Sequence, residues 1–159
     1  DSLGINQTED TVICSLDKDL LMIPGKHFSW QIGTQTWTRP AKHQTVSQQD
    51  GLRFFYKQLM IGDTSDNIQG VEGIGPKTAD KLIEHLDEEC DMLQVVLEKY
   101  KYDFDRFVKN AQCLWILRKE KEFWTTQMLN QKKDLILTDQ SLLDAIIKYN
   151  SMTSSPVDI

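Results

Sequence analysis

The order of apolar and polar residues predicts mostly helix for the second and larger part of the chain. Apolar side chains there recur at intervals of three and four, which is the period of a helix with one buried face. Ser47 is a good N-cap residue and Pro76 suits a first helical turn, so each marks a helix start. The predicted helices are one from Ser47 that ends near Gly62, one from Pro76, a short one over 92–97, a long one over 104–117 and a last one around 142–147.

Shorter stretches near the N-terminus have the composition of strands. Residues 12–16 form a β-branched apolar run that ends at a polar residue, which predicts a buried strand. Residues 27–32 and 35–39 predict a hairpin that turns at Gly33 and Thr34. This ribbon carries Trp30 and Trp37; stacking on bases is one use of such side chains, but packing is the interpretation we favour here. The pattern as a whole predicts an α/β fold with more helix than strand.

Composition and charge narrow the class of protein. The 159 residues are 40% hydrophobic and 26% charged, which is typical of a soluble domain with its own core. No run approaches the roughly 18 apolar residues that a membrane span needs, so we expect a cytoplasmic protein without membrane contact. The net charge of −6 argues against a polycation that coats nucleic acid. Cys14, Cys90 and Cys113 lack the spacing of zinc ligands, and we expect reduced, mostly buried thiols.

The segment 62–79 carries the most specific chemistry in the sequence. It reads GDTSDNIQGVEGIGPKTA, in which two aspartates precede a glycine-rich turn and the start of a helix. Glycines leave backbone N–H groups unshielded, and a helix N-terminus attracts anions. Gly73, Gly75, Lys77 and Thr78 are therefore candidate phosphate-binding residues. The alternative is an ordinary helix start with turn glycines.

Four aspartates form two pairs with matching geometry. Asp17 and Asp19 would leave an extended segment on the same face, and Asp63 and Asp66 would share one face of a helical turn. If the fold brings the pairs together, the crowded carboxylates need a counter-charge, which a hard cation such as Mg²⁺ or Mn²⁺ supplies. The alternative for each aspartate is a helix-cap or turn role.

These two motifs, in this order, resemble the 5′-nuclease family, which includes phage 5′ exonucleases, flap endonucleases and the 5′-nuclease domain of bacterial DNA polymerases. The resemblance covers roughly residues 1–125 and rests on SLDKDLL at 15–21 together with the segment 62–79. It implies the C-terminal portion of a mixed-sheet, PIN-like α/β domain over 1–60 and a helix-hairpin-helix (H3TH) DNA-binding region over 61–125. A C-terminal helix with a loose tail would follow over 126–159.

The resemblance also implies cofactors and roles. It makes Asp17, Asp19, Asp63 and Asp66 catalytic ligands of one of two Mg²⁺ or Mn²⁺ ions, with Asp1 the single candidate ligand for the other ion. In the family, the glycine turn grips duplex DNA and often holds K⁺ on its carbonyls, and the resemblance gives this DNA-binding role to Gly73, Gly75, Lys77 and Thr78. The remaining ligands are expected in an N-terminal half that this sequence lacks, supplied in the same chain or as a separate partner chain.

The implied function is that of a 5′-3′ exonuclease or flap endonuclease acting on DNA or RNA–DNA. The substrate would be a duplex with a 5′ end or flap, met in replication or recombination in a bacterial or phage-infected cell. Two departures stand out: Gln69 replaces a frequent Pro, and the family's basic arch and catalytic Arg or Lys are missing. Two alternatives stay open, a non-catalytic DNA-binding module or nuclease remnant, and an acidic scaffold with a fortuitous glycine turn.

Overall fold

The computed structural model describes residues 1–131 and 139–154 and has an α/β fold in which helix exceeds strand, as the sequence predicts. Strand β1 (Val12–Cys14) runs parallel to β2 (Gly25–Ser29), and β5 (Lys42–Val46) pairs with β2 in the antiparallel sense. The three strands form a small mixed sheet in the order β1-β2-β5. The finer assignment to a PIN-like domain with an H3TH arm stays a prediction.

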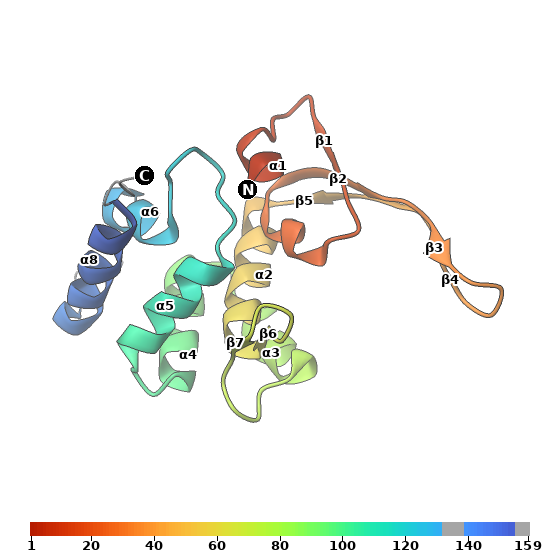
Figure 1. Ribbon diagram of the computed structural model, residues 1–159. Coiled ribbons are helices and arrows are strands. Elements are labelled where there is room, and N and C mark those ends of the chain that lie inside the picture. Colours follow the sequence, from red (N-terminus) through yellow and green to blue (C-terminus); the bar gives the residue numbers. More distant parts are fainter. Residues whose placement is uncertain (132–138, 155–159) are drawn as a thin grey trace.

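The ribbon that extends this sheet turns later than predicted. Strand β2 continues into β3 (Ile32–Gly33), and after the turn β4 (Thr38–Arg39) continues into β5. Thr34 N–H donates to Trp37 O (2.7 Å) at the turn. The predicted turn at Gly33 and Thr34 is wrong, because Gly33 pairs with a residue of β4. A Cβ on Gly33 would lie 2.3 Å from Trp37 O, so this glycine permits close strand approach. In Figure 1 the ribbon projects away from the helices.

Helix α2 (Gln48–Ile61) lies at the centre of the molecule (Figure 1). It starts as predicted, with Ser47 Oγ accepting from Asp50 N–H (3.1 Å), and it ends at Gly62, whose φ of 78° suits glycine. Phe55, Tyr56, Leu59 and Met60 are fully buried on this helix. Its neighbours are the 3₁₀ helix η1 (Lys18–Met22), α3 (Pro76–Ile83), α4 (Glu89–Lys99) and α5 (Phe104–Leu114).

The later helices confirm the predicted pattern with shifted bounds. Helix α4 is longer than the predicted 92–97, and α5 ends at Leu114 because Trp115 takes an extended conformation. Helix α6 (Trp124–Gln131) was not predicted. Helix α8 (Gln140–Ser154) confirms the last helix and takes in the start of the segment expected to be a loose tail. Residues 155–159 of that tail lie outside the described residues.

Three short elements complete the fold. Helix α1 (Ser2–Ile5) precedes β1, while β6 (Gly62–Asp63) and β7 (Ile68–Gln69) form a two-stranded sheet directly after α2. One hydrophobic cluster includes buried residues from β1, η1 and the helices α2, α3, α4, α5, α6 and α8. None of the described helices is long and apolar enough to cross a membrane. The division of the chain at 60 and 125 stays a prediction.

Two expectations about side-chain burial are wrong. The three cysteines are free, as predicted, but they are exposed; Cys14, for example, lies on the outward face of β1. Trp30 and Trp37 are 45% and 55% exposed instead of packed. The reason is geometric, because the part of the ribbon that carries both tryptophans lies beyond the helices that would cover it (Figure 1).

Candidate functional site

Helix α2 brings the two predicted aspartate motifs to one place. The amide of Gln58, only 6% exposed, donates from Nε2 to Asp19 Oδ1 (2.9 Å) and, at a longer distance, to Asp63 Oδ2 (3.4 Å). Asp19 lies in η1, which packs on α2, and Asp63 follows the C-terminal end of α2. The other amide atom, Gln58 Oε1, is buried without a hydrogen-bond partner among the described residues. One acid from each predicted pair therefore contacts the same side chain.

The Asp19 carboxylate lies beside other negative charges. Burial raises the pKa of Asp19, the hydrogen bond from Gln58 opposes this, and the charges of Asp17 and Asp63 raise the pKa further. Lys18 lowers the pKa, but its influence is smaller than that of either neighbouring aspartate. A cation beside Asp19 would relieve this repulsion.

Asp63 has the opposite environment although it is more buried, at 7% exposed. Burial acts to raise the pKa of Asp63, but backbone N–H donors and the charge of Lys18 outweigh it, so the pKa is lower than usual. The donors are Ser65 N–H (2.8 Å) and Asp66 N–H (3.4 Å). Asp63 is therefore a buried carboxylate that stays ionised at neutral pH.

Two of the other predicted ligands have local partners, and the third, Asp66, lines a different groove. Asp17 accepts from Asp19 N–H (3.0 Å) and caps η1, which is the cap role that the sequence left open. Asp66 is exposed and lines a neighbouring groove along α5. Asp1 Oδ1 accepts from Leu117 N–H (2.8 Å). Within the described residues, no group of three or more His, Cys, Asp or Glu side chains is arranged to hold a metal ion.

The glycine turn leads into α3, as predicted, with its polar groups toward solvent. Gly75 is the N-cap of α3, and its carbonyl accepts from Thr78 N–H (3.1 Å). Gly73 has a φ of 78°, and the N–H groups of Gly73 and Gly75 donate to no acceptor among the described residues. The side chains of Lys77 and Thr78 are exposed. The turn therefore presents unused donors, a cation and a hydroxyl at a helix N-terminus.

Backbone contacts tie this turn to the same end of α2 that carries Asp63. Val71 N–H donates to Met60 O (2.7 Å). A Cβ on Gly70 would lie 2.3 Å from Met60 O and from Ile61 C, so only glycine permits this approach. The loop between Asp63 and the turn is therefore fixed against the helix.

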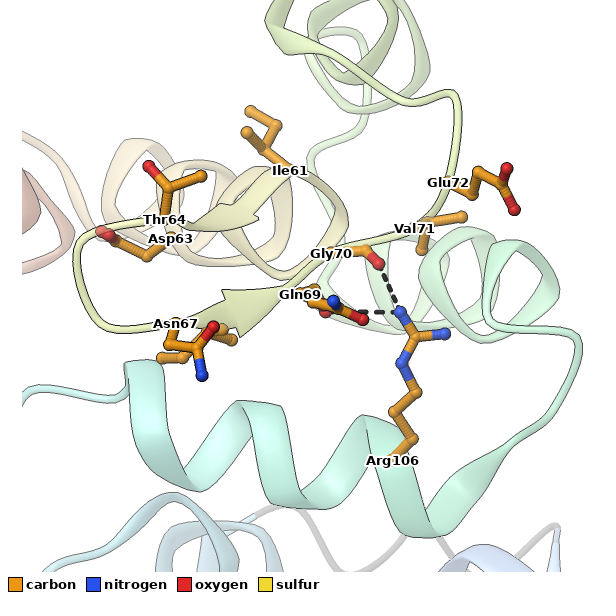
Figure 2. Close-up of a pocket in the computed structure, with 10 residues that line it drawn as sticks. Ile61, Asp63, Thr64, Asn67, Gln69, Gly70, Val71, Glu72 and Arg106 are labelled. Atoms are coloured by element: carbon orange, nitrogen blue, oxygen red, sulfur yellow. Dashed lines mark hydrogen bonds between the residues drawn. The ribbon is translucent and has the colours of Figure 1, made fainter.

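Arg106 of α5 holds the other side of this loop, as Figure 2 shows. Its Nη2 donates to Gln69 O (3.3 Å) and to Gly70 O, and Asn110 Nδ2 also donates to Gln69 O (2.9 Å). Arg106 and Asp63 both line a groove of about 770 Å³. A buried carboxylate and a cation thus share one open surface.

Sequence reasoning missed both Gln58 and Arg106. The sequence does hold an indication for Gln58, because an amide stands among the apolar residues Phe55 and Leu59 on one helix face, and buried amides need partners. Nothing in the sequence connects Arg106 with the carbonyls of residues 69 and 70, since that contact depends on how α5 packs.

No protein-family model matches the chain, and no solved structure matches it significantly. The assignment to 5′-nucleases, with its metal and DNA partners, therefore stays a prediction that rests on the two sequence motifs and on the geometry of Gln58, Asp19, Asp63 and the glycine turn.

Proposed function

We propose that the chain belongs to a metal-dependent 5′-3′ nuclease that hydrolyses DNA or RNA–DNA at 5′ ends or flaps. The shared contact of Gln58 with Asp19 and Asp63 carries the proposal, since acids from two distant motifs meet at one buried amide. A fortuitous glycine turn near unrelated aspartates would not require that contact. The resemblance of both motifs to 5′-nucleases supplies the class of reaction.

Asp19 and Asp63 are the residues that would hold a divalent cation. Two carboxylates suit Mg²⁺, which usually keeps several water ligands and takes one or two carboxylates together with substrate phosphates. The raised pKa of Asp19 fits a neighbouring cation, and Gln58 would orient both carboxylates. Bound there, the ion would activate a water and stabilise charge on the phosphoryl oxygens.

The remaining predicted ligands have lesser roles in this proposal. Asp17 and Asp66 would act through water ligands, because Asp17 already caps η1 and Asp66 lines another groove. A second ion would need acids from outside this sequence, with Asp1 as the candidate within it. The 159-residue chain alone is therefore expected to cleave weakly.

The glycine turn would hold duplex phosphates. Gly73 and Gly75 offer free N–H groups, and Lys77 offers a charge at the N-terminus of α3. Contacts to phosphate position a duplex without reading its sequence. Because Val71 N–H donates a hydrogen bond to Met60 O, a DNA backbone bound at the turn would be held at a fixed position relative to Asp63.

Cleavage of a 5′-flap DNA in Mg²⁺ or Mn²⁺ tests this proposal, with the chain alone and with an upstream acidic half added. We expect Asp19→Ala and Asp63→Ala each to lower the cleavage rate by about 100-fold or more and to weaken Mn²⁺ binding measured by electron paramagnetic resonance. Asp10→Ala is the control, because Asp10 is exposed and precedes β1, at the strand end opposite Asp17. Unchanged cleavage in both site variants would overturn the assignment.

A non-catalytic DNA-binding module is the second candidate, and the local roles of Asp17 and Asp63 favour it. Both carboxylates accept from backbone N–H groups and have a structural use without a metal. In that case Lys77→Ala and Gly75→Ala would weaken salt-sensitive duplex binding, while no metal and no added half would produce cleavage.

A further inference from the structure

The ribbon has a face that the proposed catalytic site does not use. Its two sides keep one register from the sheet to the tip, since Gly25 pairs with Val46 and Ile32 pairs with Arg39. Each side has the same number of residues between the paired segments, so no bulge shifts the alternation of side chains. Even-numbered positions on the first side and their partners on the second therefore share one face.

This face points away from the core. Ile13 of β1 and His27 of β2 are register partners and both are buried, so odd-numbered positions of β2 face the interior. Lys26 and Phe28 consequently lie on the outer face, beside the exposed Val12 of β1.

Aromatic and cationic side chains occupy the outer face. Trp30 and Trp37 are about half exposed, and Arg39 follows Trp37 by two positions and so lies on the same side. Nearer the sheet, the rings of Phe28 and His43 are in contact, with centroids 4.4 Å apart. We call this the aromatic face, formed by Lys26, Phe28, Trp30, Trp37, Arg39 and His43.

The charge of this segment differs from that of the rest of the chain. No Asp or Glu occurs between residues 20 and 49, whereas Lys26, Arg39 and Lys42 do, in a chain of net charge −6. The ribbon would therefore attract the negatively charged phosphates of a nucleic acid. Two exposed tryptophans beside these cations offer flat apolar surface to a ligand with flat rings.

We infer that the aromatic face binds single-stranded nucleic acid, with bases stacked on Trp30 and Trp37 and phosphates held by Arg39. Lys26 contributes positive charge at the sheet end of the face, where its Nζ donates to Glu9 O (3.1 Å). Every base has a π face, so stacking of this kind tolerates any sequence. The ribbon projects away from the helices (Figure 1). The inference rests on the proposed function in one respect, because a 5′ flap would supply the single strand.

Titration of the 159-residue chain with oligothymidylate in EDTA tests the inference by tryptophan fluorescence. Trp115 and Trp124 are buried, so quenching by the oligonucleotide reports on Trp30 and Trp37. We expect Trp30→Ala and Trp37→Ala each to weaken binding about fivefold or more, whereas Phe at either position retains most of it. Anisotropy of a labelled oligonucleotide measures these affinities independently of tryptophan.

The contribution of positive charge to single-strand binding is measured separately, with its own control variants. Arg39→Ala should reduce the magnitude of the log–log salt slope by about 0.7, the effect of one phosphate contact on a single strand. Met152→Ala and Lys99→Ala change an exposed apolar residue on α8 and an exposed cation on α4, and both should bind as the unmodified chain does.

Single-strand binding that is unchanged in both Trp→Ala variants would overturn the inference. So would self-association of the chain that both variants abolish in sedimentation experiments, since the face would then bind a second copy. Duplex binding and flap cleavage are measured in parallel with Lys77→Ala. If the unmodified chain binds duplex and cleaves flaps, and the Trp→Ala variants still bind single strands normally, only the ribbon inference fails. If the unmodified chain binds neither duplex nor single strands, the proposed function fails as well.

Discussion

Two pairs of glycines in one short segment differ in what surrounds them. A Cβ built on Gly62 or Gly70 would lie 2.3 Å from the nearest backbone atom, whereas a Cβ on Gly73 or Gly75 meets nothing within 4 Å. Packing of the chain on itself accounts for the first pair. It does not account for the second, and Gly75 has an ordinary φ of −98°. Backbone conformation favours glycine at position 73, where φ is 78°, and the N-cap position of α3 suits Gly75. If the proposed interface is correct, the empty space around both would let a phosphate approach the backbone closely.

Gly70→Ala should have the largest effect on stability. The added methyl group would meet Met60 O and Ile61 C, so the loop and the end of α2 would have to separate. That separation would break the hydrogen bond from Val71 N–H to Met60 O. We expect a loss of about 3 kcal/mol in the free energy of unfolding, measured by urea denaturation. A loss below about 1 kcal/mol would contradict the close approach of loop and helix.

Substitution of Asp63 and of Asp19 should have different effects on stability, although both acids lie near the packed end of α2. Asp63→Asn should cost about 1–2 kcal/mol at neutral pH, because the ionised carboxylate accepts from the N–H groups of Ser65 and Asp66. Asp19→Asn should cost less or stabilise, since burial and the charges of neighbouring aspartates disfavour its ionised form. Urea denaturation of both variants at neutral pH measures the difference.

The pH dependence follows from the direction of each pKa shift. The pKa of Asp63 is lowered, so its stabilisation is present above the unfolded value near 3.8 and is lost as pH falls through the folded value. The pKa of Asp19 is raised, so its stabilisation is complete below 3.8 and is lost as pH rises through the folded value. The stability gap between the two variants should therefore narrow in acid. Equal stabilities at neutral pH would contradict the opposite environments.

Local sequence patterns predicted the elements that their own residues determine. Ser47 caps α2 through its hydroxyl, and Pro76 starts α3, because both effects act within one helical turn. The strand at β1 was predicted from its β-branched run. The sequence also raised the meeting of the two aspartate pairs as a condition, but it did not specify that Asp19 and Asp63 would be the two acids that contact Gln58.

Contacts between distant segments account for what could not be predicted. The ribbon turn was misplaced because Gly33 could suit a turn or a close strand approach, and only pairing with β4 decides. Trp30 and Trp37 were expected to pack, since the sequence does not show that the ribbon extends past the helices. The role of Gln58 could not be predicted, because its contacts with Asp19 and Asp63 depend on how η1 packs against the end of α2.

Gly73→Ala tests the open side of the comparison. Its φ of 78° disfavours a side chain, while the space around it is empty, so only backbone strain should count. We expect a loss of about 1 kcal/mol. Gly73→Asn should lose less, because Asn tolerates this conformation better. A loss as large as that of Gly70→Ala would mean that the turn is packed after all.

Gly75→Ala should have the smallest effect on stability, within about 0.5 kcal/mol. Ala is a poorer N-cap than Gly, but it reduces the freedom of the unfolded chain, and these effects oppose each other. Duplex binding should nevertheless weaken about tenfold, because a methyl group on the turn would hold a phosphate away from the free N–H groups. Fluorescence anisotropy with a labelled duplex measures the affinity, and urea denaturation of the same sample measures stability.

Duplex affinity and stability of Gly75→Ala test two different parts of the proposal. A variant that unfolds early would show that the fold needs this glycine, and the contrast with Gly70 would disappear. A variant that is stable and binds duplex like the unmodified chain would remove the turn from the proposed interface, whatever Asp19 and Asp63 do. Because Lys77→Ala removes a charge without altering the backbone, its loss of affinity should shrink in high salt, whereas the loss caused by Gly75→Ala should persist. That difference would identify the backbone N–H groups themselves as the contact.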